Sequence, residues 1–325
     1  MNFSRIPRRR LRAALAGALV IAGLAACGGG TTQYATFTPQ RLLVFGDDMS
    51  ALTSTGLKYA VNGFTSVDNG DGTTTNVPDC TAIPNWAQTM ASAYGFVFAE
   101  CNPGNVDVPK ARMLAAAGAT VDDISAQIDN QIAAGGFFDG DLATMLAGAN
   151  DIIQLYQQFP VRSEADLENE LRSRGKALAL QINRLVGFGA KVIFVTVPDQ
   201  GLTPYAVKQR NEFTDTDRAA LLTRLTEAFN EQLGANVVLD GRYVGLVQGD
   251  VRSQSMVRSP SSYGLSNVTD GACLDTAPLP NCDTSTLVDG AGAATWMWAD
   301  DLRPAFALNQ QIATLAIARV RGNPF

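Results

Sequence analysis

Short apolar runs alternate along this chain with longer segments in which apolar residues recur at helical spacing. This pattern predicts strands at the short runs and helices at the longer segments. The expected strands are 41–46, 95–100, 141–147, 191–197 and 236–239, and the expected helices are 84–93, 121–133, 164–186, 215–233 and 304–320. Such alternation is typical of a parallel sheet covered by helices, so the predicted fold class is α/β, a three-layer sandwich with a mainly parallel five-stranded sheet.

Three of the expected helices begin with a hydroxyl residue that is followed three positions later by an aspartate. The pairs resemble capping boxes, in which a hydroxyl and a carboxylate bind the free amides of the first helical turn. They are Thr120 with Asp123, Ser163 with Asp166, and Thr214 with Asp217.

Two segments interrupt the alternation of strands and helices. Around 58–79, the turn-forming sequence Asn69-Gly70-Asp71-Gly72 stands between β-prone residues and predicts an inserted hairpin. The segment 259–295 is rich in Ser, Pro, Gly and Asp and is too long for a plain connection. We expect it to form a disulfide-stapled loop near the carboxyl ends of the strands, within one domain that spans 41–325.

The N-terminus has the features of an export signal. Five arginines within the first 12 residues precede an apolar run, 13–23, which leads into Leu24-Ala25-Ala26-Cys27. The run is shorter than the roughly 20 residues that span a bilayer, and small residues before a cysteine resemble the lipobox of bacterial lipoproteins. We expect residues 1–26 to be removed, Cys27 to carry lipid and 27–40 to act as a flexible tether. The alternative is an ordinary signal peptide with a chance cysteine.

By the same resemblance, the protein is expected in the bacterial cell envelope as an outer-membrane lipoprotein, at the periplasmic face or the surface. Gly28, rather than Asp, follows the lipidated cysteine, which favours the inner face of the outer membrane. The lipid on Cys27 would attach the protein to the membrane, its expected partner.

The net charge of the chain excludes some classes of partner. Five of the 25 basic residues lie in the expected signal and all 31 acidic residues lie beyond it, so the remaining 299 residues carry a net charge of −11. Such a body would be repelled by nucleic acid and by anionic membrane surfaces.

The even number of cysteines beyond Cys27 suggests two disulfides in an exported protein. Sequence proximity favours Cys80–Cys101 and Cys273–Cys282, although four cysteines allow three connectivities. A metal site is the weaker interpretation, because the chain has no histidine and no C-x-x-C motif. We expect neither a metal nor another cofactor.

Ligands of open α/β sheets bind at the carboxyl ends of the strands, and four segments of this chain match a known pattern there. The segments are Val44-Phe45-Gly46-Asp47-Asp48-Met49-Ser50, Ala117-Gly118-Ala119-Thr120, Gly148-Ala149-Asn150-Asp151 and Asp300-Asp301-Leu302-Arg303-Pro304. In order and spacing they resemble the four blocks of the SGNH hydrolases, also called GDSL-like lipases or acylhydrolases. The resemblance covers the whole mature chain and implies a flavodoxin-like sheet and ester hydrolysis.

The chain departs from this family at the two residues that carry the chemistry. The nucleophilic serine of the family corresponds to Asp48, and its histidine base corresponds to Arg303. A serine hydrolase needs a base that takes up and returns a proton near neutral pH, and a guanidinium stays protonated. Ser50 lies two residues past the nucleophile position, and we interpret it as a first-turn helix residue. These departures predict a pseudoenzyme.

A carboxylate and a guanidinium at these two positions predict an ion pair. Our hypothesis is that Asp48, just before a helix N-terminus, and Arg303 form an ion-pair network with Asp300 or Asp301 in place of the catalytic triad. Gly118 and Asn150 match the oxyanion-hole donors of the family. A tight helix entry at Gly118 and a helix cap at Asn150 are the structural alternatives.

Three functions fit these residues. The favoured one is a degenerate SGNH fold that binds an acylated or glycan-like ligand. The second is an ester hydrolase in which Asp48 attacks as a carboxylate nucleophile and Asp300 or Asp301 activates the deacylating water. The third is an envelope protein in which Asp48, Asp300 and Asp301 hold a hard cation such as calcium.

Overall fold

The computed structural model describes residues 37–322 and Phe325. The expected signal segment, Cys27 and most of the expected tether therefore lie outside the described residues. None of the helices within the described part is both long and apolar enough to cross a membrane.

The core of the described part is one parallel sheet with the strand order β4-β1-β5-β6-β7. Its strands are β1 (Arg41–Gly46), β4 (Ala111–Met113), β5 (Asp141–Leu146), β6 (Lys191–Val195) and β7 (Val244–Val247). Every residue of β5 is buried, as expected for a central strand that is covered on both faces. The order reverses direction between β1 and β5, and this is the switch point at which such sheets bind ligands.

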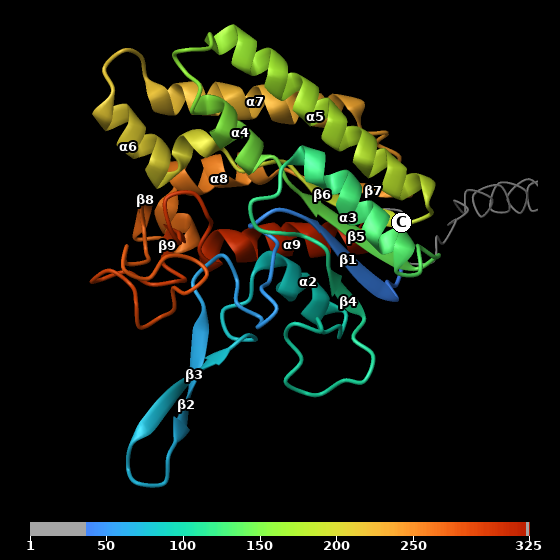
Figure 1. Ribbon diagram of the computed structural model, residues 1–325, viewed down its shortest axis with the longest axis vertical. Coiled ribbons are helices and arrows are strands. Elements are labelled where there is room, and N and C mark those ends of the chain that lie inside the picture. Colours follow the sequence, from blue (N-terminus) through green and yellow to red (C-terminus); the bar gives the residue numbers. More distant parts are fainter. Residues whose placement is uncertain (1–36, 323–324) are drawn as a thin grey trace, which may run out of the picture. The chain divides into compact units, whose positions relative to one another are not determined.

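Helices cover both faces of this sheet, which confirms the predicted three-layer α/β class (Figure 1). The helices α3, α5 and α7 pack together on one face, and α2 and α9 pack on the other. The bounds are α2 (Trp86–Ala93), α3 (Val121–Ala133), α4 (Ala149–Tyr156), α5 (Glu164–Gly187), α6 (Pro204–Glu212), α7 (Arg218–Asn236), α8 (Gly249–Arg258) and α9 (Phe306–Gly322), with 3-10 turns at η1 (Gln200–Leu202) and η2 (Pro260–Tyr263).

Two of the five strand predictions are wrong. The segment 95–100 forms no strand beyond two isolated bridges at Phe98, and the edge strand is β4 instead. Phe96 and Phe98 are buried in alternation, which imitates a strand, but the chain turns at once to bring Cys101 to its disulfide partner.

The segment 236–239 is not a strand either, because α7 continues to Asn236 and the last strand of the five-stranded sheet is β7. Val237 is buried in the core, but Val238 and Leu239 are 67% and 56% exposed, so the run lacks the burial of a sheet strand. Short apolar runs do not by themselves distinguish a strand from the end of a helix.

The helix starts agree with two of the three expected capping pairs. Asp123 accepts a hydrogen bond from the Thr120 amide at 2.8 Å, and Ser163 accepts one from the Asp166 amide at 3.2 Å. The third pair is wrong, because α7 begins after Asp217, whose own carboxylate accepts the amide of the third helical residue at 3.0 Å. An aspartate is an equally good N-cap, and it displaces the start of the helix by three residues.

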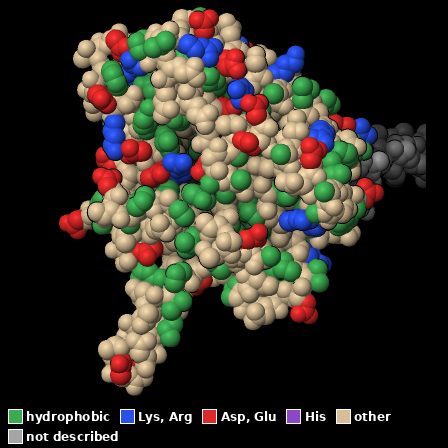
Figure 2. All heavy atoms as spheres, in the orientation of Figure 1, with side chains coloured by type: hydrophobic (Ala, Val, Ile, Leu, Met, Phe, Trp, Pro, Cys, Tyr) green, Lys and Arg blue, Asp and Glu red, His purple; other side chains and the backbone are tan. Residues whose placement is uncertain are grey.

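The segment expected as a hairpin contains β2 (Gly63–Asp68) and β3 (Thr74–Asp79), which pair antiparallel. This arm projects away from the sheet and shows few charged side chains on the face in view (Figures 1 and 2). Cys80–Cys101 closes its base, and Cys273–Cys282 lies within the 259–295 loop, so both expected disulfides are present. Within this loop, β8 (Asn267–Gly271) pairs with β9 (Trp296–Trp298), which directly follows the loop.

Candidate active site

The first site residues lie in a tight turn directly after β1. Gly46 has φ +138°, and a Cβ there would come within 2.0 Å of the Leu146 carbonyl oxygen, so a glycine is required where β1 and β5 approach. The residues 47–50 form a turn and not a helix, which corrects the predicted helix start after Asp48. Ser50 is fully buried, and its hydroxyl accepts a hydrogen bond from the Trp86 indole at 3.2 Å, so it does not serve the site.

The Asp48 carboxylate binds the two residues that match the oxyanion-hole donors. Its Oδ2 accepts hydrogen bonds from the Gly118 amide at 3.0 Å and from the Asn150 side chain at 2.8 Å. The same Asn150 amide group also donates to the Ala119 carbonyl at 2.9 Å, which fixes its orientation. Both donors thus bind a carboxylate of this chain. A tight helix entry at Gly118 and a helix cap at Asn150, the structural alternatives, do not fully describe them.

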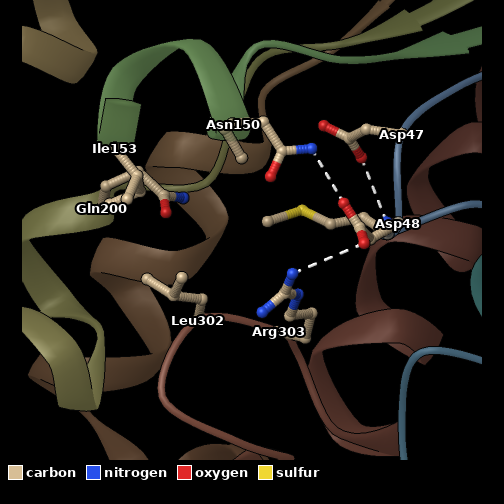
Figure 3. A pocket seen from close by; sticks show the side chains of 9 residues that line it. Asp47, Asp48, Asn150, Ile153, Gln200, Leu302 and Arg303 are labelled. Atoms are coloured by element: carbon tan, nitrogen blue, oxygen red, sulfur yellow. Dashed lines mark hydrogen bonds and ion pairs between the residues drawn. The ribbon is translucent and has the colours of Figure 1, made fainter. Parts of the chain in front are cut away.

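The other oxygen of Asp48 faces Arg303. Arg303 Nη2 lies 3.4 Å from Asp48 Oδ1, and Arg303 Nη1 lies 3.3 Å from Asp300 Oδ2. Asn150 and Arg303 approach the Asp48 carboxylate from opposite sides (Figure 3). We call Asp48, Gly118, Asn150, Arg303 and Asp300 the Asp48 network.

Asp300 and Asp301 have different surroundings, which the sequence did not distinguish. Asp300 Oδ1 accepts the amides of Leu302 and Arg303 at 2.8 and 2.6 Å, and burial raises the pKa of this carboxyl while the Arg303 charge opposes the rise. Asp301 instead pairs with Lys208 at 2.7 Å and lies outside the network. Asp300, and not Asp301, is therefore the aspartate that joins Asp48 and Arg303 in the expected ion-pair network.

Because Asp301 is turned away, Asp48, Asp300 and Asp301 do not form the cation site that was the third alternative. Among the described residues, no group of three or more His, Cys, Asp or Glu side chains is arranged to hold a metal ion.

Asp47, which sequence reasoning did not single out, is a buried acid beside the network. It is 1% exposed, and its Oδ1 accepts the Met49 amide at 3.0 Å, whereas its Oδ2 has no hydrogen-bond partner among the described residues. Burial, together with the adjacent charge of Asp48, raises the pKa of Asp47 to about 8. The group is therefore protonated and neutral at pH 7. Its only signal in the sequence is its place as the first of two adjacent aspartates after a buried strand.

The space beside the network is very small. A cavity of about 10 Å³ is lined by Asp47, Asp48, Met49, Ala149, Asn150, Ile153, Gln200, Leu302 and Arg303. This volume corresponds to about one water molecule, so an acyl group does not fit without movement of the side chains. Gln200, also missed from the sequence, is fully buried in this wall, and its Oε1 has no partner among the described residues.

Asp151, the last residue of the Gly-x-Asn-Asp block, supports the site from behind. Its Oδ2 accepts the Val121 amide at the start of α3 at 3.0 Å, and its Oδ1 lies 3.1 Å from Arg174 Nη1. Burial raises the pKa of Asp151 to about 6, against the effect of these two partners. It joins α4 to α3 and α5 and so holds Asn150 and Gly118 at their places.

Comparisons with known proteins give no family assignment. No protein-family model matches the chain, and none of the curated proteins matches its sequence. Among solved structures, the chain is similar to a member of the lipolytic protein G-D-S-L family from Veillonella parvula, with 12% identity, 85% of this chain and 96% of the other covered, and a TM-score of 0.44. It is also similar to an acetylxylan esterase from Geobacillus stearothermophilus, with 13% identity, coverages of 88% and 96%, and a TM-score of 0.41. At these values, nothing about the chemistry of this chain follows from either likeness.

Replacement of Asp47 by Asn is expected to stabilise the protein increasingly as the pH rises. The folded state holds the Asp47 proton up to a pH of about 8, whereas the unfolded chain releases it near the ordinary value of 3.8. The contribution of Asp47 to the free energy of unfolding is therefore largest below the ordinary pKa of 3.8. It falls as the pH rises to about 8, by up to about 1.4 kcal/mol per pH unit. Asparagine resembles the neutral acid and has no such loss.

Urea unfolding of wild type and Asp47→Asn from pH 4 to pH 9 would measure this effect. The stability difference between the two proteins should grow with pH and level off above about pH 8. Asp68→Asn, a change of the same chemistry on the exposed hairpin, is the control and should give a flat difference. A flat difference for Asp47→Asn as well would show that Asp47 is ionised in the folded protein.

Proposed function

We propose that this chain is a lipid-anchored protein of the bacterial cell envelope, with an SGNH-type hydrolase fold, that binds a ligand and does not hydrolyse esters. The observation that carries the proposal is the state of Asp48, whose two carboxylate oxygens are held by Gly118, Asn150 and Arg303. Asp48, at the position of the nucleophile, thus binds the two groups that match the oxyanion-hole donors.

Ester hydrolysis at this site lacks three requirements. A nucleophile needs a free lone pair directed at the substrate, and the Asp48 oxygens are directed at donors of the protein. Donors for a developing oxyanion must be available to it, and the Gly118 and Asn150 donors already bind a charged oxygen. A base is also absent from the Asp48 network, because Arg303 holds its protons and Asp300 accepts two backbone amides.

The ligand expected from the family resemblance, acylated or glycan-like, does not fit the water-sized cavity. In this proposal it binds on the surface around Leu302, which is half-buried and lines that cavity. The Asp48 network then serves as a rigid base for the surface. An ester hydrolase with Asp48 as nucleophile is the competing function, and the next experiment separates the two.

Hydrolysis of short-chain and long-chain aryl esters should be undetectable with the purified soluble body from Thr31 onward. Asp48→Ala should be equally inactive. Asp48→Ser combined with Arg303→His should gain activity, because a serine would no longer occupy the Gly118 and Asn150 donors and an imidazole could accept its proton. Addition of Asn150→Ala should lower that gained activity by about 10²-fold or more, the effect of losing one oxyanion donor.

Wild-type turnover that is lost in Asp48→Ala would refute the non-hydrolytic proposal and make Asp48 a nucleophile. Wild-type turnover that Asp48→Ala leaves unchanged would point to a contaminant or to another site, which a repeat with Asp48→Asn purified independently would distinguish.

The membrane anchor is tested by metabolic labelling of the full chain with a radioactive fatty acid in a bacterial host. The wild-type protein should incorporate the label and sediment with membranes, and Cys27→Ser should incorporate none. Cys80→Ser combined with Cys101→Ser is the matched control and should keep the label. Equal labelling of wild type and Cys27→Ser would contradict lipidation at Cys27.

A further inference from the structure

Exposed apolar side chains gather at the edge where the strands of the parallel sheet begin. Phe138 precedes β5, Phe188 follows α5, and Val238 and Leu239 follow α7. Phe138 and Phe188 are 43% and 40% exposed, and Val238 and Leu239 are more exposed still. We call these four residues the basal rim. An exposed apolar patch of this kind marks an interaction surface more often than a scattered apolar residue does.

Contacts between neighbouring segments place the basal rim on one surface. The Phe137 ring stacks on the Phe188 ring with centroids 5.1 Å apart, so the loop that carries Phe138 lies against the end of α5. The Val238 amide donates a hydrogen bond to the Asn183 side chain of α5 at 2.9 Å, which brings the segment after α7 to the same end of that helix. This surface lies on the side of the sheet that is marked C in Figure 1.

The chain enters the sheet at this same edge. Phe37, the first described residue, packs edge-on against the Phe325 ring at a centroid distance of 5.9 Å, and Lys191 at the start of β6 lies 5.8 Å from the centre of the Phe37 ring. Cys27 precedes Phe37 by ten residues, which span at most about 36 Å. A lipid on Cys27 would thus hold the basal rim close to a bilayer. The Asp48 network lies at the opposite ends of the strands, about 20 Å further along the six residues of β1.

The charges that border the basal rim offset one another. The Arg41 guanidinium lies 4.4 Å from the centre of the Phe138 ring. The Arg184 guanidinium lies 5.6 Å from the centre of the Phe188 ring. These two arginines and the one that follows Leu239 each pair with an aspartate: Arg41 with Asp141, Arg184 with Asp129, and Arg242 with Asp240. The net negative charge expected of the mature chain is therefore not concentrated at this edge.

We propose that the basal rim rests on the surface of the membrane that anchors the chain, with its apolar side chains in the interfacial layer of the lipids and its arginines at the headgroups. The proposal rests on the lipid anchor at Cys27 of the proposed function. Because the anchor keeps the basal rim beside the bilayer, its effective concentration there is high, and a contact of four side chains that is too weak to recruit a free protein becomes stable. The Asp48 network then faces away from the membrane.

Fluorescence quenching in vesicles tests this orientation. The full-length lipidated protein would be reconstituted into phosphatidylcholine vesicles with lipids brominated near the headgroup end of the acyl chains, which quench a tryptophan that enters the lipid. Relative to wild type, Phe138→Trp and Leu239→Trp should each add fluorescence that is quenched and shifted to shorter wavelength. Val161→Trp is the matched control and should add unquenched fluorescence. Val161 is 95% exposed and precedes α5, so that the whole 24-residue helix, about 36 Å long, separates it from Phe188.

A second set of variants tests whether the apolar side chains make the contact. Phe138→Ser combined with Phe188→Ser should remove most of the quenching of the Leu239→Trp reporter. Val161→Ser in the same reporter protein is the control and should leave the quenching unchanged. Urea unfolding of each variant identifies any loss of folding, and the single tryptophan reporters keep the proposal testable if the double variant does not fold.

The possible failures of the anchor and of the basal rim are distinguishable. In protein whose lipid is confirmed by mass spectrometry, no quenching at Phe138→Trp and Leu239→Trp, or equal quenching at Val161→Trp, would overturn the proposal and leave the anchor intact. If Cys27 carries no lipid, the anchor fails. The basal rim is then tested with the body from Thr31 onward, which keeps every described residue, bound through an N-terminal hexahistidine tag to nickel-chelating vesicles of the same lipids.

In that tagged sample, quenching at both reporters would support contact of the basal rim with lipid, and no quenching would overturn it. A second copy of the chain is the competing occupant of this surface. A shift of the reporters to shorter wavelength that appears without vesicles and grows with protein concentration would show such a copy and would also overturn the proposal.

Discussion

The Asp48 carboxylate connects four segments that are far apart in the sequence. It belongs to the turn after β1, and its partners are an amide before α3, a side chain in the first turn of α4 and a guanidinium before α9. These segments meet because β1 and β5 are parallel neighbours whose carboxyl ends lie at one edge of the sheet. Removal of the carboxylate would break these partly buried hydrogen bonds, each of which contributes about 1 kcal/mol.

The excess of negative charge in this region is smallest when Asp47 is neutral. A single guanidinium, Arg303, serves both Asp48 and Asp300 at distances of 3.3 to 3.4 Å. These distances are longer than those of a strong charge-assisted hydrogen bond, so the network fixes geometry more than it adds stability. An ionised Asp47 would be a third aspartate beside one guanidinium and would add repulsion that no further ion pair among the described residues offsets, and the raised pKa of Asp47 avoids this arrangement.

The sequence was sufficient for the sheet class, the central strands and the long helices, because these have clear periodicity. It failed at 95–100, where apolar residues pack against a disulfide turn, and at 236–239, where two of three apolar residues remain exposed at a helix end. The resemblance to known motifs selected Asp48, Gly118, Asn150 and Arg303, and the structure brings them together. It could not select between Asp300 and Asp301, since that choice depends on where Lys208 of α6 lies. Nor could it show the neutral Asp47, whose protonation follows from burial in three dimensions.

A double-mutant cycle between Asp48 and Arg303, measured by urea unfolding, tests the central claim most directly. Asp48→Asn and Arg303→Met should each destabilise the protein, and the double variant should lose less than the sum of the two losses. We expect a coupling free energy of about 1 kcal/mol or more, as for residues in one hydrogen-bonded network. Losses that add to within about 0.5 kcal/mol would show that the two side chains do not interact and would contradict the account.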